Sequence, residues 1–252
     1  MTLRDFSDHY SERSDEYRRT RPTYPPALID WLASFARDRA LAWDAGCGSG
    51  QLSVPLARVF ERVVGSDASV AQIMAARAHP RVHYRVARAE ASGLPNGVAD
   101  LCVAAQAVHW FDVDAYAAEV ARVGRPRSRV ALVTYGRPRL PGGLDAALQR
   151  FHTDVLAPFW PSERRHVDAA YRSIPFPFSE VPAPAFDMTH HWALSRFNGY
   201  VETWSAVRAA RSGGAGAAVD AFTDELAGGW GEPDKELPVR WLVTVRAGTV
   251  AG

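Results

Sequence analysis

Short apolar runs alternate with amphipathic segments from residue 41 to residue 135, and this alternation constrains the fold most strongly. The apolar runs have the length and composition of buried strands, whereas the segments between them show helical periodicity. Strands that alternate with helices predict a parallel sheet covered by helices on both faces. The expected strands are LAWDA (41–45), RVVGSD (62–67), VHYRV (82–86), ADLCVAAQA (99–107) and RVALVTY (129–135). The expected helices span residues 51–60, 70–78 and 113–123, with Ser69 and Asp112 as N-caps of the last two.

The flanking segments extend this pattern. A proline-rich turn and a helix fill residues 21–36, and further helices are expected at 144–156, 162–171, 196–207 and 217–227. Strands are expected in DMTHHWAL (187–194) and VRWLVTVRA (239–247). A strand that returns after a long insertion can pair antiparallel at the sheet edge. We therefore expect an α/β, Rossmann-like, doubly wound and mostly parallel sheet of seven strands, with an antiparallel edge strand and a small helical cap insertion.

These elements suggest four segments of the chain. Residues 1–36 form an N-terminal lid and helix, residues 37–136 a ligand-binding core, residues 137–184 a cap, and residues 185–252 complete the sheet.

Composition limits the classes of partner. The 252 residues carry a net charge of +1, with 47% hydrophobic and 23% charged residues, which is ordinary for a soluble globular protein. This balance provides no strong field toward nucleic acid or an anionic membrane. No apolar run is long enough to span a membrane, and the charged N-terminus has no secretory signal. Only two cysteines occur, and neither suggests a disulfide framework, so we expect a cytoplasmic protein. We also expect a monomer or homodimer.

Three glycines follow the first expected strand in the segment WDAGCGSG (43–50). Gly46, Gly48 and Gly50 allow a tight turn or the close approach of a ligand. Ligands of open parallel sheets bind at this end of the strands. Asp44 precedes the glycines, and its carboxylate would repel a phosphate but attract a cation.

Two classes of cofactor fit a glycine loop of this kind. Asp67 ends the second expected strand, where a carboxylate can bind both hydroxyls of a ribose. A dinucleotide also requires a pyrophosphate site, usually with the spacing GxGxxG. S-adenosylmethionine carries an ammonium and a sulfonium and has no phosphate. The spacing GxGxG and Asp44 favour S-adenosylmethionine, with a nicotinamide-dependent oxidoreductase as the alternative.

The same segments carry a family resemblance. They are WDAGCGSG (43–50), VVGSDAS (63–69), ARAEASGLP (87–95), ADLCVAAQAVHWFD (99–112) and RVALVTY (129–135). In these segments the chain resembles class I S-adenosylmethionine-dependent methyltransferases. A narrower resemblance, to the trans-aconitate methyltransferase-like subgroup, lies in RPTYP (21–25), AQAVHWFD (105–112), VDAAYRSIPFPF (167–178) and NGYVETWSAV (198–207).

The resemblance implies a set of cofactor-binding residues. Asp44 and the glycine loop would hold the methionine end, Asp67 the ribose, and Gln106 would close the site near the reactive methyl. Ala89 and Glu90 would meet the adenine edge, although Arg88 stands where the family often has an acid. The full expected set is Tyr10, Arg21, Asp44, Gly46, Cys47, Gly48, Gly50, Asp67, Ala68, Ala89, Glu90 and Gln106.

The acceptor pocket is less well defined by the sequence. His109 is a candidate general base, because histidine suits proton transfer near neutral pH, and it is also a candidate pocket residue. Aromatic candidates for the pocket wall are Trp110, Tyr171, Tyr200 and Trp204. No metal-binding motif occurs, so we expect no metal.

The sequence thus predicts a methyltransferase that converts S-adenosylmethionine to S-adenosylhomocysteine while methylating a small-molecule acceptor, on a carboxylate or a hydroxyl oxygen. A carboxylate acceptor would need an arginine to orient it, and Arg21 and Arg172 are candidates. A protein that binds the cofactor without transferring the methyl group is a further alternative.

Overall fold

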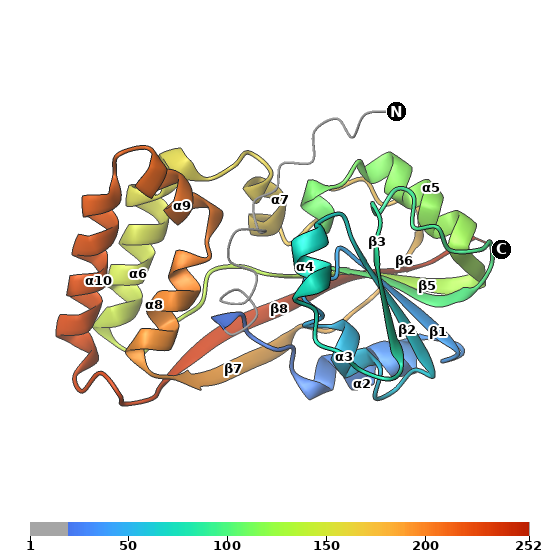
Figure 1. The fold of residues 1–252 in the computed structure, drawn as a ribbon, viewed down its shortest axis with the longest axis horizontal. Helices are drawn as coiled ribbons and strands as arrows, with labels where there is room; N and C mark the ends of the chain where they lie inside the picture. The colour runs from blue at the N-terminus through green and yellow to red at the C-terminus, as the bar shows by residue number, and fades with distance from the viewer. Residues whose placement is uncertain (1–19, 252) are drawn as a thin grey trace.

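A twisted sheet of eight strands forms the centre of the fold (Figure 1). The computed structural model describes residues 20–251. The strands are β1 (Leu41–Ala45), β2 (Arg62–Asp67), β3 (Val82–Val86), β4 (Ala99–Ala105), β5 (Gly124–Tyr135), β6 (Ser179–Val181), β7 (Phe186–Trp192) and β8 (Leu237–Thr249). Their order is β3-β2-β1-β4-β5-β8-β6, and β7 also pairs with β8. The first five strands are parallel, and β8 is antiparallel to β5.

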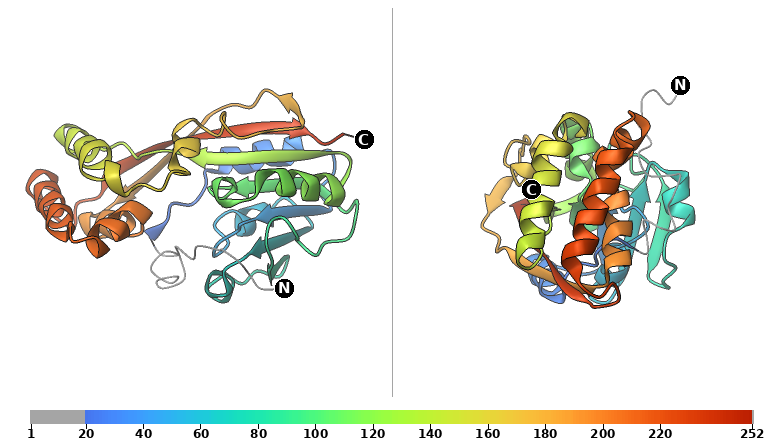
Figure 2. Two further views of the ribbon diagram at one scale, coloured as in Figure 1. Left: turned by 90° about the horizontal axis from the view of Figure 1, so that it is seen from above. Right: turned by 90° about the vertical axis from the view of Figure 1, so that its left-hand side faces the viewer.

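The helices divide into those that cover the sheet and those beyond its end. The α-helices are α2 (Pro26–Phe35), α3 (Ser53–Leu56), α4 (Val70–Met74), α5 (Val113–Val123), α6 (Gly143–Arg150), α7 (Arg164–Asp168), α8 (Leu194–Glu202), α9 (Ser205–Ser212) and α10 (Gly216–Trp230). Two short 3₁₀ helices, η2 (Val108–Trp110) and η4 (Ala157–Phe159), and a π-helix, η3 (Phe151–Val155), complete the set. Helices α6, α8, α9 and α10 gather beyond one end of the sheet (Figure 2), and we call this group the cap.

Alternation along the central strands produces two hydrophobic layers, because successive side chains of a strand point to opposite faces. Leu101 and Val103 of β4 face a layer shared with α2 and α3, which continues into the cap. Cys102 and Ala104 of the same strand face the layer that packs against α5. The doubly wound α/β class predicted from the sequence is therefore confirmed.

The sheet differs from the expectation at its antiparallel side. It has eight strands instead of seven, and β8 is not an edge strand, because β6 and β7 pair with its outer side. Strand β6 lies in the segment 137–184, for which the sequence predicts helices and no strand. Pro182 and Pro184 separate β6 from β7, since proline cannot donate a ladder hydrogen bond.

Four elements have the expected boundaries, and the remaining elements are shifted, shortened, extended or divided relative to the prediction. Strands β1, β2 and β3 and helix α5 occupy the expected residues, and both predicted N-caps form: Ser69 accepts from Gln72 N and Asp112 from Ala115 N. The helix expected at 51–60 is reduced to α3. Pro55 lies inside it, and the backbone bonds after it are partly of the shorter i to i−3 type.

The cap takes its helices from two parts of the chain. Helix α6 comes from the segment 137–184 and packs against α10, which comes from the segment after it. The carboxyl end of β5 leads directly toward α6, so the cap lies at the end of the sheet where the parallel strands finish (Figure 1). This arrangement encloses the space in which ligands of such sheets bind.

Candidate active site

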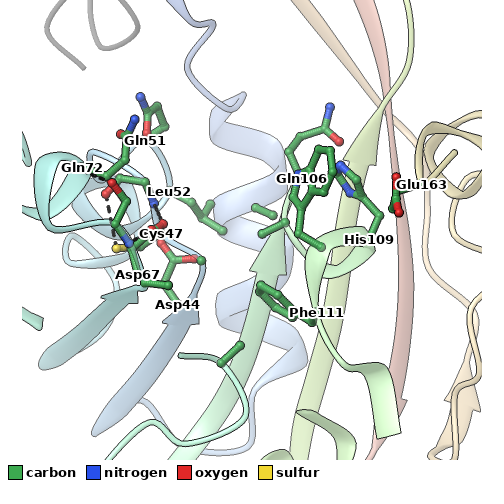
Figure 3. Close-up of a pocket in the computed structure, with 18 of the residues that line it drawn as sticks. Asp44, Cys47, Gln51, Leu52, Asp67, Gln72, Gln106, His109, Phe111 and Glu163 are labelled. Atoms are coloured by element: carbon green, nitrogen blue, oxygen red, sulfur yellow. Dashed lines mark hydrogen bonds between the residues drawn. The ribbon is translucent and has the colours of Figure 1, made fainter. Parts of the chain in front are cut away.

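A cavity of about 640 Å³ lies at the carboxyl ends of β1, β2 and β4. We call it the cofactor cavity. Figure 3 shows two groups of side chains facing each other across it: Asp44, Cys47 and Asp67 on one side, and Gln106 and His109 on the other. The expected cofactor-binding residues that line it are Arg21, Asp44, Gly46, Cys47, Gly48, Asp67, Ala68, Ala89, Glu90 and Gln106. Tyr10 lies outside the described residues.

The glycine loop depends on its glycines for two different reasons. Gly46, Gly48 and Gly50 all have positive φ angles, of 67°, 53° and 89°. A Cβ on Gly46 would lie 2.5 Å from Ala107 Cβ, and one on Gly50 would overlap the Tyr84 hydroxyl. A Cβ on Gly48 would have no neighbour closer than 3.5 Å. Packing therefore requires the outer two glycines, of which Gly50 supports the loop without lining the cofactor cavity, whereas Gly48 borders the cavity.

Asp44 is a buried carboxylate with an incomplete set of partners. Its side chain is on the last part of β1, the residue is 1% exposed, and Oδ2 accepts a hydrogen bond of 2.6 Å from Ser53 Oγ. Among the described residues, Oδ1 has no hydrogen-bond partner. Burial raises the Asp44 pKa to about 7, and the Asp67 charge adds to the rise. A cationic ligand group would provide the missing partner and would restore the ionised form.

Asp67 connects the end of β2 to the glycine loop. Its Oδ2 accepts from Gly48 N at 2.8 Å, and its Oδ1 accepts from Ser69 N at 2.9 Å. These two bonds fix the plane of the carboxylate at the cavity wall. Each carboxylate oxygen has a second lone pair, so Asp67 can also accept from two ligand hydroxyls.

Gln106 lies directly after β4 in a strained backbone conformation, with a φ of 55°. Its amide nitrogen donates to Tyr135 O at 2.7 Å, and its amide oxygen accepts from Thr134 Oγ1 at 2.8 Å. Both partners belong to β5. A non-glycine residue at such an angle costs roughly 1–3 kcal/mol and is characteristic of functional sites.

Ala89 and Glu90, which follow β3, form another part of the cofactor cavity wall. The Glu90 carboxylate accepts from Arg88 Nε at 3.2 Å and from Asp112 N at 2.9 Å. Arg88, which replaces the acid expected from the family pattern, is thus held by the neighbouring Glu90. Ala89 and Glu90 can still offer backbone atoms and a carboxylate to the edge of an adenine base.

His109 is held by Tyr171 at the opposite end of the cavity. Its Nδ1 lies 2.9 Å from the Tyr171 hydroxyl, and Tyr171 is fully buried. Ala170 and Tyr171 have φ angles of 50° and 60°, so the chain is strained where it presents this hydroxyl. Burial, with a contribution from the Arg164 charge, lowers the His109 pKa to about 3. The imidazole is therefore neutral at physiological pH.

A second cavity of about 60 Å³ lies between the strand ends and the cap. We call it the cap cavity. Tyr200 and Trp204 line it, whereas Trp110 and His109 line both cavities. Tyr171 lines neither cavity and reaches the site through His109. Arg172 is exposed and also lines neither cavity.

Sequence reasoning missed the residues that the tertiary structure brings to the site. In the cofactor cavity they include Gln72, Tyr135 and Glu163, and in the cap cavity Arg137, His152, Trp160 and Arg164. Arg137 follows β5 by two residues, so the rule that ligands bind at strand ends could have indicated it. Tyr135 ends β5 itself, so the same rule applies to it. Gln72, His152, Glu163 and Arg164 lie in segments predicted as helices and Trp160 lies outside them, and no local pattern marks any of them as a site residue.

Comparisons with known proteins bear on this geometry. Residues 43–132 match the family described as "Methyltransferase domain". A Dictyostelium discoideum protein named as a methyltransferase is 31% identical over 208 residues, which cover 81% of this chain and 79% of that protein. The chain belongs to the methyltransferases. This membership favours methyl transfer over the oxidoreductase alternative.

Two further similarities refine the comparison. A solved structure from Anaeromyxobacter dehalogenans, described as a type II methyltransferase, shares 46% identity with a TM-score of 0.84 and covers 92% of this methyltransferase and 98% of that chain. A Saccharomyces cerevisiae relative named as an S-adenosylmethionine-dependent methyltransferase is 27% identical over 135 residues, 50% of this chain and 46% of the relative.

Residues 20–251 contain neither a candidate metal site nor a candidate membrane-spanning helix. No group of three or more histidine, cysteine, aspartate or glutamate side chains is arranged to hold a metal ion there. No helix in the same range has the length and apolar character to cross a membrane.

Proposed function

We propose that this methyltransferase transfers a methyl group from S-adenosylmethionine to a small-molecule acceptor, on a carboxylate or a hydroxyl oxygen. S-adenosylmethionine is the cofactor of the methyltransferases that this chain resembles, and the residues present fit it. The observation that carries the proposal is the buried Asp44 carboxylate, whose Oδ1 has no partner among the described residues. The resemblance to the trans-aconitate methyltransferase-like subgroup, the cytoplasmic location and the monomeric or dimeric state belong to the same proposal.

Different residues of the cofactor cavity would contact different parts of the cofactor. Asp44 would hold the ammonium, and Asp67, fixed by two backbone N–H groups, would accept from the ribose hydroxyls. Ala68, Ala89 and Glu90 would border the adenine, with Gln106 near the reactive methyl. An opposite charge restores the ionised form of a buried carboxylate, so Asp44 favours a cationic ligand over a phosphate.

The chain's main contribution to the reaction is alignment. The bound cofactor supplies an electrophilic methyl group on a sulfonium. A lone pair of the acceptor oxygen forms the new bond to the methyl carbon while the carbon–sulfur bond breaks and its electrons stay on sulfur. Walls that hold both reactants in line and exclude water lower the barrier by several kcal/mol.

The fate of the proton depends on the acceptor. A carboxylate acceptor has no proton to lose, whereas a hydroxyl acceptor must release one to a base or to water. His109 borders both cavities as a neutral imidazole and could accept it. With a pKa of about 3 it is a weak base, so orientation of the acceptor is the stronger role for this side chain.

Calorimetry with S-adenosylhomocysteine tests the cofactor site. We expect binding by the wild type and a loss of about 100-fold for Asp67→Ala, because two hydrogen bonds to a charged group contribute roughly 3 kcal/mol. The matched control is Asp187→Ala, an exposed aspartate on β7 that lines neither cavity. The absence of heat with the wild type would overturn the proposal.

A labelled-methyl assay against a mixed metabolite extract tests transfer. Appearance of a labelled product supports an enzyme and identifies its acceptor. Cofactor binding without any labelled product would instead identify a protein that binds S-adenosylmethionine without catalysis.

A further inference from the structure

The cap cavity adjoins the cofactor cavity. Five of the described residues line both, among them Gln106, His109 and Trp110 at the end of β4. A ligand that lies against these residues is therefore within reach of groups from both cavities. The volume of the cap cavity, about 60 Å³, has room for a group the size of a few water molecules and not for a whole metabolite.

Among residues 20–251, the charged side chains that line the cap cavity are all basic. Arginines and histidines line it, and none of the aspartates or glutamates in this range does. The carboxylates that pair with its arginines lie outside the lining: Asp145 binds Arg137 at 2.7 Å, and Asp168 binds Arg164 at 3.0 Å.

These ion pairs hold the guanidinium groups in place without using all of their donors. The side chains of Arg137 and Arg164 are 13% and 19% exposed. Asp168, by contrast, is 55% exposed, so solvent weakens its compensation of the Arg164 charge. Arg164 Nη1 has no hydrogen-bond partner among the described residues, and Arg164 Nη2 has only the 3.5 Å contact with His152 Nε2. Two donors of one guanidinium thus remain available to a planar anion.

The positive charge of the arginines also affects the pKa values of the histidines in this cavity. Burial lowers the pKa of His152 to about 4, and the charges of Arg164 and Arg137 add to this effect against the opposing charge of Asp168. His109 is similarly neutral. Neutral imidazoles can donate a single N–H to an anion while the arginines supply the charge.

Aromatic side chains make the walls of this cavity flat. The Arg164 guanidinium lies 4.7 Å from the centre of the Trp160 ring, and the Trp160 and Trp204 ring centres are 5.9 Å apart. Trp160 Nε1 donates to the His152 backbone at 3.1 Å. His152 belongs to the π-helix η3, an element that is frequent at functional sites. Flat, rigid walls favour a planar group over a tetrahedral one.

We propose that the cap cavity binds a carboxylate of the methyl acceptor, and that this carboxylate is distinct from the atom that is methylated. Arg137 and Arg164 line the cap cavity and not the cofactor cavity, so a group bound by them lies away from the methyl donor. The nucleophilic atom would then lie at the shared wall, near Gln106 and His109. This inference rests on the proposed function, because it names the class of acceptor: a small molecule with a carboxylate and a second nucleophilic group.

Calorimetry on the full chain saturated with S-adenosylhomocysteine tests this site. The probes are benzoate, phenylacetate and 3-phenylpropionate, each compared with its uncharged amide. We expect at least one carboxylate to bind, and its amide to bind at least tenfold more weakly, since bidentate binding to arginine requires the anion. No binding by any of the three carboxylates, or equal binding of acids and amides, would overturn the proposal.

Variants locate the binding within the molecule. Arg164→Gln should weaken the carboxylate at least tenfold, Arg164→Lys should weaken it less, and both should keep the wild-type affinity for S-adenosylhomocysteine. Arg172→Gln, which changes an exposed arginine outside both cavities, is the matched control and should have no effect. An unchanged carboxylate affinity in Arg164→Gln would place the site elsewhere and refute the assignment.

Two further outcomes keep the hypotheses separate. Tighter binding of phenyl phosphate than of every carboxylate would show that the cavity selects a phosphate, and the carboxylate assignment would be wrong. If S-adenosylhomocysteine itself fails to bind, the proposed function fails, and the cap cavity result is then read from the carboxylate titration without the cofactor.

Discussion

The two cavities of the site differ in the sign of their buried charge and in the way the chain builds them. The cofactor cavity places the carboxylates of Asp44 and Asp67 beside a glycine loop, on the ends of neighbouring parallel strands. The cap cavity has Arg137 and Arg164, from separate segments, in its lining, and no carboxylate from the described part of the chain lines it. A carboxylate wall suits a cationic methyl donor, and a guanidinium wall suits an anionic acceptor. Under the proposed function, one end of the sheet would thus separate the two ligands by charge.

The opposite charges should give the two cavities opposite effects on stability, and Asp44→Asn should show the largest of these. The Asp44 pKa is about 7 in the folded chain against an ordinary value of 3.8. The folded chain therefore binds this proton more tightly than the unfolded chain, so stability falls as pH rises from 3.8 to 7. At pH 8 we expect Asp44→Asn to raise the free energy of unfolding by on the order of 4 kcal/mol in the ligand-free protein.

Urea unfolding at pH 8 and pH 4 measures this effect. Near pH 4 the wild-type carboxyl is protonated in the folded chain, so the variant should then differ little from wild type. The same substitution should weaken S-adenosylmethionine binding at pH 8, because the ammonium loses its counter-charge. A variant that is less stable than wild type at pH 8 would contradict the account of Asp44.

The two histidines that line the cap cavity change stability with pH in the opposite direction to Asp44. The pKa values of His109 and His152 are lowered from 6.5 to about 3 and about 4. Their contribution is complete above pH 6.5 and is lost as pH falls toward these values. The acid side of the stability curve of Asp44→Asn should therefore become steeper than that of wild type, where the two effects oppose each other.

A pair of glycine substitutions tests whether the glycine loop of the cofactor cavity tolerates a side chain. Gly46 and Gly97 have similar φ angles of 67° and 62°, but only at Gly46 would a Cβ collide with Ala107 and Phe111. Both alanine variants incur about 1–2 kcal/mol for the left-handed conformation. Gly46→Ala should lose a further 1–3 kcal/mol of unfolding free energy from overpacking, together with cofactor affinity.

Gly97→Ala is the control in the same urea titration, since nothing lies within 4 Å of its added methyl group. Equal losses in the two variants would mean that the loop tolerates a side chain at Gly46. The close packing of β4 against the loop would then not define the cavity.

A tyrosine pair gives the smallest expected effect and concerns the wall shared by the cavities. Tyr171→Phe removes the hydroxyl 2.9 Å from His109 Nδ1 and should cost about 1 kcal/mol of unfolding free energy. Because His109 would lose its orientation, the KM for the acceptor should rise several-fold while S-adenosylhomocysteine affinity stays constant. A change in cofactor affinity with no change in KM would contradict a role for this pair at the acceptor.

Tyr116→Phe is the matched variant, in α5 and in the same hydrophobic layer as Tyr171. The Tyr116 hydroxyl is buried, and among the described residues it has no hydrogen-bond partner. Its removal should therefore be neutral or slightly stabilising, and should change neither KM nor cofactor affinity.

The same contrast explains what the sequence could predict. The cofactor side follows local rules: β1 and β2 end where their apolar runs end, and the glycines and Asp67 follow at fixed spacing. These residues could be identified without coordinates, although their roles stay predictions. The shortened α3 shows the limit of periodicity, since Pro55 interrupts a segment whose apolar residues suggest a longer helix.

The cap side depends on contacts between distant parts of the chain. His152 and Arg164 lie in segments predicted as the helices 144–156 and 162–171, but the chain forms a π-helix and a five-residue helix there. The periodicity of a regular α-helix therefore does not tell which of their side chains face inward. Strand β6 could not be predicted either, because it has only three residues, lies between prolines and is defined by its pairing with β8. Contacts between distant parts of the chain, and not the local secondary-structure propensity, determine the conformation of these segments.

Strand β8 has a mechanical consequence for the way the acceptor enters. It pairs with β5 from Val243 to Thr249 and with β7 from Leu237 to Val243, so one unbroken strand runs from the cap to the far side of the sheet. Hinges usually form at a few loop residues. Rotation of the cap relative to the sheet would instead have to bend strand β8 and strain its hydrogen bonds to β5 and β7. We therefore expect the cap and the sheet to move as one rigid frame, and the acceptor to reach its cavity through the segments around the opening rather than by the swing of a domain.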